Sequence, residues 1–370
     1  MSTRHEVTVK PIDEVAKFMK NLIPVNIPEA YTLKPRLESL ASGERIRNAV
    51  VAFKDFMYLF FDRLITDGHL YAKPPKKPSS MTDYPFLSNV ACLLVEMGYY
   101  SKLADSGESL LITEMPSCNA YIDENGKRKG PNISGVNTME CLRFLSLCGF
   151  AFNGIDFEAK TVVISQAQPL EVTYPNHPVM LTGLKAMAIA DKELRKRRGW
   201  NDNSILRCDY RLLKEEDTDT SDVLKDFLHP LPEQIQAFAL KLHHRYTSMG
   251  MTCSIRVLGD INFAYADVRK SRRDLSPTDI YSLSIWQVSI SMKKGYSLFI
   301  RPKKTDKYKD IIEKFPSHLR EKIEKSYGCD RKRNERCQGG CQGIRIPLDE
   351  LILDIGGDIE TWLDSEMSLS

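Results

Sequence analysis

The strongest hydrophobic pattern of the chain begins near residue 44. Apolar residues recur there at alternating intervals of four and three positions, which places them on one face of a helix. The residues of this stripe are Ile46, Val50, Phe53, Met57, Phe60 and Leu64. Phe56 and Phe61 widen the stripe, so the pattern predicts a buried core helix over 44–66 and favours it over the narrow seam of a coiled-coil dimer.

Two further helices and a β-hairpin are predicted after a proline-rich stretch. Pro85 opens the first helix, and Asn137 is a candidate N-cap of the second. The turn Asn153-Gly154 and the β-branched run at 161–164 then predict a pair of antiparallel strands. Helices followed by a two-stranded wing are typical of a winged helix, so the front half of the chain is predicted to be helical and winged-helix-like.

A third long helix is predicted over 176–198, and it ends in a basic cluster. The cluster consists of Arg195, Lys196, Arg197 and Arg198. These cations are candidates for contacts with the phosphates of DNA, which makes them the candidate nucleic-acid-binding residues. The alternative is that they only complement the negative end of the helix macrodipole. A short strand is predicted next, over 205–213.

The last third of the chain predicts an antiparallel sheet between helices. A helix is predicted over 232–249, and strand signals follow, including a hairpin over 281–301. Apolar and polar residues alternate along this hairpin, which is typical of a sheet with one covered face. The polar members are Gln287, Ser289 and Ser291. A basic run that begins at Arg301 lies at the hairpin end, where charges protect an exposed edge. Helices are predicted from residue 306 and over 358–367.

The order of these elements is helix, four strands, helix, cysteine-bearing loop, short strand and helix. In outline, the last third resembles small bacterial α+β domains of no known activity. The resemblance implies an α+β fold for this part of the chain and brings no catalytic motif with it. The chain is therefore predicted to be α+β, with a C-terminal antiparallel-sheet domain flanked by helices behind the winged-helix-like front half.

Two segments have the composition of connections between domains. The segment 73–80, KPPKKPSS, holds three prolines and three lysines, which neither a helix nor a central strand tolerates. The segment 215–222 is acidic. We therefore predict an N-terminal helical region over 1–78, a winged-helix-like α+β region over 79–214 and an α+β sheet domain over 222–370.

The composition is that of a globular protein. Of the 370 residues, 42% are hydrophobic and 27% are charged, and the net charge of +3 is too small to indicate nucleic-acid binding by itself. The longest apolar candidate, over 49–65, is interrupted by charged residues, so no membrane span or membrane partner is expected. Because the N-terminus lacks a secretory signal, we expect a cytoplasmic protein with reduced cysteines.

Three cysteines, Cys329, Cys337 and Cys341, lie in a glycine-rich and basic stretch near the C-terminus. Thiolates bind zinc well, and neighbouring cations favour the thiolate form. A structural zinc site has four ligands, and His318 and Cys253 are the candidates for the fourth. The spacing departs from the usual paired pattern, so a surface loop with unligated thiols is the alternative, and a redox-responsive loop is a third interpretation. No cofactor is expected unless these residues hold zinc.

The sequence contains no motif that identifies a reaction. A nucleophile elbow, a phosphate-binding loop and a dinucleotide-binding loop are all absent. We therefore favour a non-enzymatic binding or regulatory protein, with DNA or a small molecule as its ligand. The hairpin face with Gln287, Ser289 and Ser291 could, together with Arg256, present a small-ligand site, or it could be a plain solvent face. An enzyme with a site assembled from distant residues is the second hypothesis, and a metal- or redox-responsive protein using the three cysteines is the third.

Overall fold

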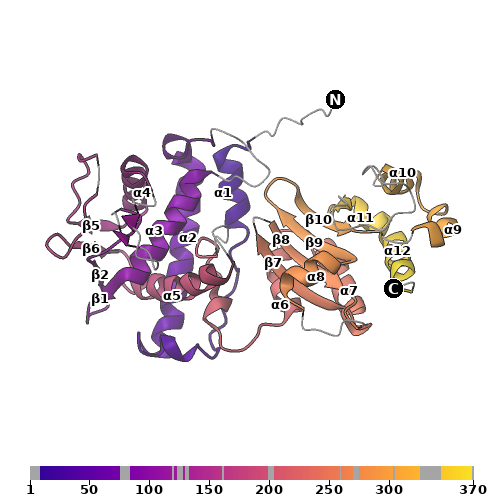
Figure 1. The fold of residues 1–370 in the computed structure, drawn as a ribbon, viewed down its shortest axis with the longest axis horizontal. Helices are drawn as coiled ribbons and strands as arrows, with labels where there is room; N and C mark the ends of the chain where they lie inside the picture. Colours follow the sequence, from indigo (N-terminus) through magenta and orange to yellow (C-terminus); the bar gives the residue numbers. More distant parts are fainter. Residues whose placement is uncertain are drawn as a thin grey trace. The chain divides into compact units, whose positions relative to one another are not determined.

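The computed structural model divides the chain into two compact units, which we call unit 1 (residues 1–218) and unit 2 (residues 219–370) (Figure 1). The structure describes residues 9–75, 84–118, 121–122, 128–129, 133–160, 162–198, 204–258, 260–269, 275–302, 305–325 and 343–368. Both units combine helices with an antiparallel sheet, so the predicted α+β class is confirmed. The predicted boundary at 78/79 falls inside unit 1, whereas the acidic connection at 215–222 contains the end of that unit. In the described part of the chain, no helix combines the length and the apolar composition needed to cross a membrane.

The body of unit 1 is a set of packed helices. Its described α-helices are α1 (Ile12–Lys20), α2 (Gly43–Tyr71), α3 (Pro85–Tyr100), α4 (Gly135–Leu147) and α5 (Met180–Arg198). The predicted core helix is α2, and every member of its apolar stripe is buried. The Ser42 side chain accepts a hydrogen bond from the backbone N–H of Arg45 and so caps the start of α2. Because α2 contacts α1, α4 and α5, the helix predicted within 1–78 packs with helices predicted within 79–214.

Glycines set how closely α5 approaches its two main neighbours, α2 and α3. A Cβ atom at Gly183 of α5 would lie 2.1 Å from the carbonyl oxygen of Ala49 in α2. A Cβ atom at Gly98 of α3 would lie 2.4 Å from the Cβ of Ala188 in α5. Neither position has room for a side chain, so the three helices pack with their backbones close together.

A four-stranded antiparallel sheet completes unit 1. Its strands lie in the order β1 (Ser101–Leu103), β2 (Ser109–Ile112), β6 (Leu170–Thr173) and β5 (Ala151–Asn153). A short antiparallel pair, β3 (Tyr121–Ile122) and β4 (Arg128–Lys129), lies between β2 and α4 in the sequence.

The first strand of the predicted hairpin of unit 1 is present, but the strand predicted to pair with it is not. β5 pairs with β6, so the connection between the two strands runs over 154–169. The β-branched run predicted as a strand lies in this connection, and its described residues 162–164 form no strand. Strand pairing distinguishes the two segments: β6 pairs with both β2 and β5, whereas the run at 162–164 pairs with no described strand, although Val162 and Ile164 are buried.

The strand predicted over 205–213 is wrong. This segment forms turns and the 3₁₀ helix η2 (Tyr210–Leu213). Its apolar residues are buried and η2 contacts α5, so the pattern read as a strand comes from a loop packed on helices. Cys208 adopts a positive φ of 48°, which is incompatible with an extended strand.

Unit 2 is built on a five-stranded antiparallel sheet. The strands lie in the order β11 (Ile344–Pro347), β10 (Gly295–Ile300), β9 (Trp286–Ser291), β8 (Asp260–Ala266) and β7 (Thr252–Leu258). The helix α8 (Pro277–Leu283) is inserted between β8 and β9 and lies against β7 and β8 (Figure 1). Residues 281–283, predicted to open the hairpin, therefore belong to a helix. A capping box of Ser276 and Asp279 starts this helix, which is a local signal for a helix and not for a strand.

One face of this sheet forms the core of unit 2 with α6 (Thr220–Leu228) and α7 (Glu233–Ser248). Phe227 of α6 lies edge-on to Phe263, with ring centroids 6.0 Å apart. Tyr246 of α7 contacts Trp286 in the same way at 5.7 Å. The remaining helices of the described part of unit 2 are η3 (Thr305–Lys307), α9 (Lys309–Ile312), α10 (Ser317–Lys325), α11 (Leu351–Asp354) and α12 (Gly356–Ser368). The opposite face of the sheet carries mainly polar side chains.

Candidate functional site

The predicted zinc site is only partly described by the structure. Cys329, Cys337 and Cys341 lie outside the described residues. His318, a candidate fourth ligand, is exposed at the start of α10. Cys253, the other candidate, lies on β7, and its thiol is hydrogen-bonded with Tyr265. Among the residues that the structure describes, no group of three His, Cys, Asp or Glu side chains could hold a metal ion. Zinc binding stays a prediction, which the metal content of protein purified under reducing conditions tests.

The predicted nucleic-acid-binding residues form the last turn of α5. These residues are Arg195, Lys196, Arg197 and Arg198. Their side chains lie outside the described part of the structure, so their contact with phosphates also stays a prediction.

The face of the unit 2 sheet that points away from α6 and α7 carries a band of polar side chains. The strand register places Arg256 of β7 opposite Asn262 of β8, and Asn262 opposite Ser289 of β9. Ser289 in turn lies opposite Ser297 of β10. The neighbouring row across β9, β10 and β11 consists of Gln287, Phe299 and Arg345. Residues far apart in the sequence therefore share one face.

The polar residues of this face are buried. Gln287 and Ser297 are 1% exposed, and Ser289 is fully inaccessible. The amide of Gln287 donates a hydrogen bond of 2.7 Å to the Ser284 hydroxyl beyond the end of α8. The interpretation of this alternation as a plain solvent face is therefore wrong. Burying hydroxyl and amide groups costs free energy unless each group is hydrogen-bonded. Several buried and hydrogen-bonded polar groups on one face are typical of a site with a defined polar structure.

Three arginines and two aromatic rings alternate along the edge of this buried face. The guanidinium carbon Cζ of Arg256 lies 4.1 Å from the centre of the Tyr281 ring. The Cζ of Arg301 lies 4.9 Å from the same ring and 5.4 Å from the Phe299 ring. The Cζ of Arg345 lies 5.1 Å from the Phe299 ring. We call these five residues the arginine cluster; each guanidinium is within the range of a cation–π interaction.

Hydrogen bonds to the protein hold two of the three guanidiniums. Nη1 of Arg345 donates to the hydroxyl oxygens of Ser289 and Ser297, at 2.9 and 2.8 Å. Nη1 of Arg301 donates to the backbone carbonyl of Tyr281 at 2.8 Å. The Nε groups of Arg256 and Arg301 are buried and have no hydrogen-bond partner in the described part of the chain. The arginine cluster therefore keeps donors that the described residues do not use.

Described residues offset the positive charge of the arginine cluster only in part, through the Asp260 carboxylate near Arg345. No ion pair joins Arg256, Arg301 or Arg345 to a carboxylate in the part of the chain that the structure describes. Burial lowers the pKa of Arg345 below its usual value, although the Asp260 carboxylate acts in the opposite direction. A half-buried guanidinium that is not ion-paired with a carboxylate is unfavourable unless another anion binds beside it. The arrangement can therefore accept an anion.

Sequence reasoning found only part of this site. It placed Arg256 and the polar residues of β9 together, but it interpreted Arg301 as protection of a strand end. It gave no role to Arg345, Tyr281 or Phe299. The available signal for Arg345 was its position between Ile344 and Ile346, because an arginine between two core isoleucines of a strand must point to the opposite face.

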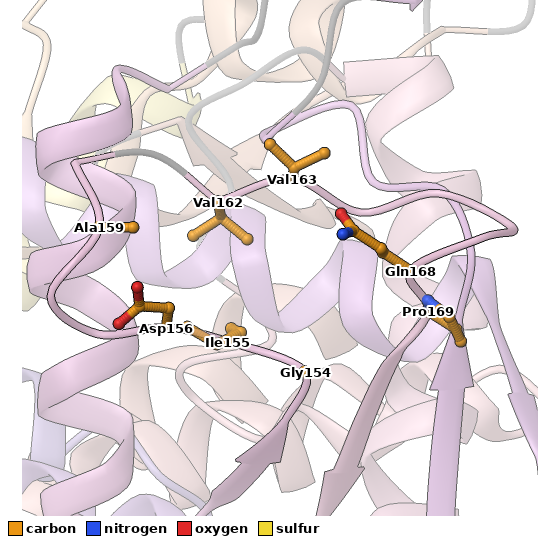
Figure 2. Close-up of a pocket in the computed structure, with 8 residues that line it drawn as sticks. All are labelled: Gly154, Ile155, Asp156, Ala159, Val162, Val163, Gln168 and Pro169. Carbon is orange, nitrogen blue, oxygen red and sulfur yellow. The ribbon is translucent and has the colours of Figure 1, made fainter.

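A small hollow lies in the connection between β5 and β6 of unit 1 (Figure 2). It has a volume of about 350 Å³. The residues that line it are Gly154, Ile155, Asp156, Ala159, Val162, Val163, Gln168 and Pro169. Asp156 accepts a hydrogen bond from the backbone N–H of Glu158, which shapes the loop. Its lining contains no nucleophile with an adjacent base, so we assign no chemistry to it.

Comparisons with protein-family models, with curated proteins and with solved structures found no match for this chain.

Proposed function

We propose that this chain is a binding protein whose unit 2 takes a small anionic ligand on the arginine cluster. The observation that carries the proposal is the presence of three guanidiniums with no carboxylate partner among the described residues. Guanidinium forks bind carboxylates and phosphates through two parallel hydrogen bonds, which gives both affinity and orientation. Binding is favoured over catalysis because Ser289 and Ser297 use their hydroxyl oxygens to accept from Arg345, and no histidine of the described residues is hydrogen-bonded to either hydroxyl.

Thermal unfolding of the full chain at constant ionic strength tests this proposal. A ligand that binds only the folded state stabilises it by RT ln(1 + [L]/Kd), so phosphate, sulfate or citrate should raise Tm in a saturable manner. Arg256→Gln should abolish the rise, because Arg256 contributes charge and unused donors. Arg320→Gln is the matched control, since it removes one positive charge from an exposed position of the same unit. Equal Tm rises in wild type and Arg256→Gln would contradict the proposal.

Unit 1 is the second candidate, as a winged-helix-like module that binds duplex DNA. The supporting observation is its topology: α4 leads into the hairpin of β5 and β6, and β6 pairs with β2. Val136 and Leu147 are exposed on α4, but they are apolar and cannot attract phosphates. The proposal therefore depends on the basic end of α5. Fluorescence anisotropy with a labelled duplex should show binding that weakens steeply with salt. Absence of binding at low salt would remove this candidate.

A further inference from the structure

We infer that the outer edge of β7 binds an extended, acidic peptide segment of a partner protein, which adds to the sheet of unit 2 as a sixth strand. This interaction goes beyond the proposed function and rests on it in one respect, because it uses the capacity of Arg256 to accept an anion. In strand addition, hydrogen bonds between main chains give the affinity, and the side chains of the edge strand give the specificity.

The outer edge of β7 is open. β7 is an outer strand of the five-stranded sheet, and β8 is the strand that pairs with it. An edge strand presents a row of N–H and C=O groups on the side away from its neighbour. Among the described residues, no group outside β8 forms a hydrogen bond with the main chain of residues 252–258. These outward groups are therefore available to the main chain of an incoming strand.

β7 also lacks the features with which proteins prevent pairing at a sheet edge. Protected edges are short, or they carry a proline, a lysine or a β-bulge. β7 has seven residues, Thr252–Leu258, without proline or lysine, and its register with β8 is uninterrupted. The other outer strand of the sheet, β11, has four residues and includes Pro347. In unit 1, the outer strands β1 and β5 have three residues each. β7 is thus the longest outer strand in the described part of the chain.

Arg256, the one charged residue of β7, selects the charge of the incoming strand. Its guanidinium is held against the Tyr281 ring of α8, with the side chain half-buried. The Nε of Arg256 is buried, whereas Nη1 and Nη2 form no hydrogen bond with a described residue and are accessible. In an added antiparallel strand, the Cβ of the residue opposite Arg256 lies about 4.5–5.5 Å from the Cβ of Arg256. An aspartate or glutamate at that position therefore reaches the guanidinium.

The same charge favours an acidic partner over a second copy of this chain. In the two-fold register that pairs all seven residues of β7 with a second β7, Ile255 lies opposite its own copy and Arg256 lies opposite Ser254. The two Arg256 side chains are then diagonal neighbours on one face, about 7–8 Å apart and within reach of each other. Like charges in this arrangement repel, whereas a carboxylate in the incoming strand attracts.

The other face of β7 determines the pattern of the peptide. Cys253, Ile255 and Val257 lie on the face covered by α6 and α7, and each is only half-buried. Apolar side chains of an added strand would remove this apolar surface from water, which is favourable. Because successive side chains of a strand point to opposite faces, the peptide is expected to alternate apolar residues with polar ones, with an acid opposite Arg256.

Fluorescence anisotropy of labelled peptides with the full chain tests this inference. The probe is the acetylated and amidated peptide EVTVEVTVE. KVTVKVTVK reverses its charge, and EPTPEPTPE keeps the acids but lacks the N–H groups that a strand needs. We expect EVTVEVTVE to bind at least about tenfold more tightly than either control. Arg256→Glu should reverse the preference in favour of KVTVKVTVK, a gain that a misfolded variant would not show. Arg320→Gln, at an exposed position, should leave the preference unchanged.

Hydrogen exchange of the wild-type chain gives a second measurement that needs no variant. Saturating EVTVEVTVE should slow exchange of the amides at 252–258 and leave those at 344–347 of β11 unchanged. Unchanged exchange at 252–258 would overturn strand addition. A dimer in sedimentation, with the amides at 252–258 protected in the absence of peptide, would identify a second copy as the occupant and overturn the acidic partner.

The outcomes with the peptides separate this inference from the proposed function. Binding of EPTPEPTPE as tight as that of EVTVEVTVE would overturn strand addition and leave an anion site. Equal binding of the acidic and lysine peptides would overturn the role of Arg256 in selecting the partner. If EVTVEVTVE does not bind while citrate still raises Tm, the strand-addition inference alone fails. If neither ligand binds, both proposals fail.

Discussion

The guanidinium of Arg256 lies over the ring of Tyr281, 4.1 Å from its centre. Tyr281 comes from α8, and Arg256 comes from β7, so this contact attaches the inserted helix to the sheet. Because Arg301 also lies over the Tyr281 ring, a single aromatic side chain keeps two positive charges in place. The arginine cluster thus depends on α8, the helix that is inserted between β8 and β9 in the sequence.

Replacement of Tyr281 by leucine should weaken both stability and anion binding. It removes two cation–π contacts, each of about 0.5–2 kcal/mol, so the free energy of unfolding of unit 2 should fall by roughly 1–4 kcal/mol. Urea unfolding monitored by tryptophan fluorescence measures this effect, because Trp286 and Trp362 are buried in unit 2. Tyr281→Phe is the matched control: it keeps the ring and should keep both properties. Equal losses in the two variants would mean that the hydroxyl, and not the ring, is important.

Replacement of Gly183 by alanine should destabilise unit 1. The added Cβ would lie 2.1 Å from the carbonyl oxygen of Ala49, which forces α5 and α2 apart. Overpacking of this kind costs about 1–3 kcal/mol. Gly357→Ala is the control, because a Cβ at that helical position meets no atom within 4 Å and should be neutral or slightly stabilising. Circular dichroism of thermal unfolding compares the two, and an unchanged Tm for Gly183→Ala would contradict the close helix packing.

His243 should make unit 2 less stable in mild acid. The His243 side chain is buried, its Nδ1 lies 2.9 Å from the Tyr265 hydroxyl, and burial together with the neighbouring His244 lowers its pKa, against the opposite influence of Asp219. The unfolded chain therefore binds a proton more readily than the folded chain. This contribution to stability is full above the unfolded pKa of about 6.5 and is lost as the pH falls below it.

Urea unfolding between pH 7.5 and pH 5 measures the effect. As the pH is lowered, the free energy of unfolding should decrease less steeply in His243→Gln than in the wild type. His318→Gln serves as control, because the exposed His318 side chain is solvated in both states. An identical slope in His243→Gln and wild type would show that the His243 proton is not linked to folding.

The end of unit 1 should be the first site of limited proteolysis. Glu215 and Glu216 are exposed and lie just before the boundary between the two units at 218/219. A protease specific for glutamate should therefore cut here first and release fragments that match the two units in mass. Mass spectrometry of the first products checks this. A first cut after Glu44, within α2, would contradict the division into these units.

The sequence predicted those elements whose own side chains carry a strong period. The stripe of α2 identified the helix, and the alternation in β9 identified the apolar face of the sheet, without tertiary information. The strand at 162–164 was predicted wrongly because β-branched residues form a strand only where a neighbouring strand pairs with them, and β5 pairs with β6 instead. The strand predicted over 205–213 was wrong for a different reason: the buried apolar residues of this segment belong to a loop that packs on helices.

The arginine cluster shows what sequence patterns omit. Alternation assigned Arg256 and Ser289 to polar positions, and this part of the site was predicted. The addition of Arg345 depends on the pairing of β11 with β10, and that of Arg301 depends on the position of α8 over the sheet. The position of Arg345 between two core isoleucines indicates its face of the sheet, but neither the pairing of β11 nor the position of α8 has a local signal, because both arise from contacts between distant segments. The arginine cluster is therefore built from residues whose proximity is set by the tertiary fold and not by their spacing in the sequence.

Observation of the arginine side chains during ligand binding tests the central claim most directly. In ¹H–¹⁵N spectra of the full chain, the Nε–H signals of Arg256, Arg301 and Arg345 can be assigned by single Arg→Lys variants. Addition of citrate should shift these three signals together along one saturable curve, while the signal of Arg320 stays in place. Three unshifted signals at saturating citrate, or equal shifts at Arg320, would contradict an anion site at the arginine cluster.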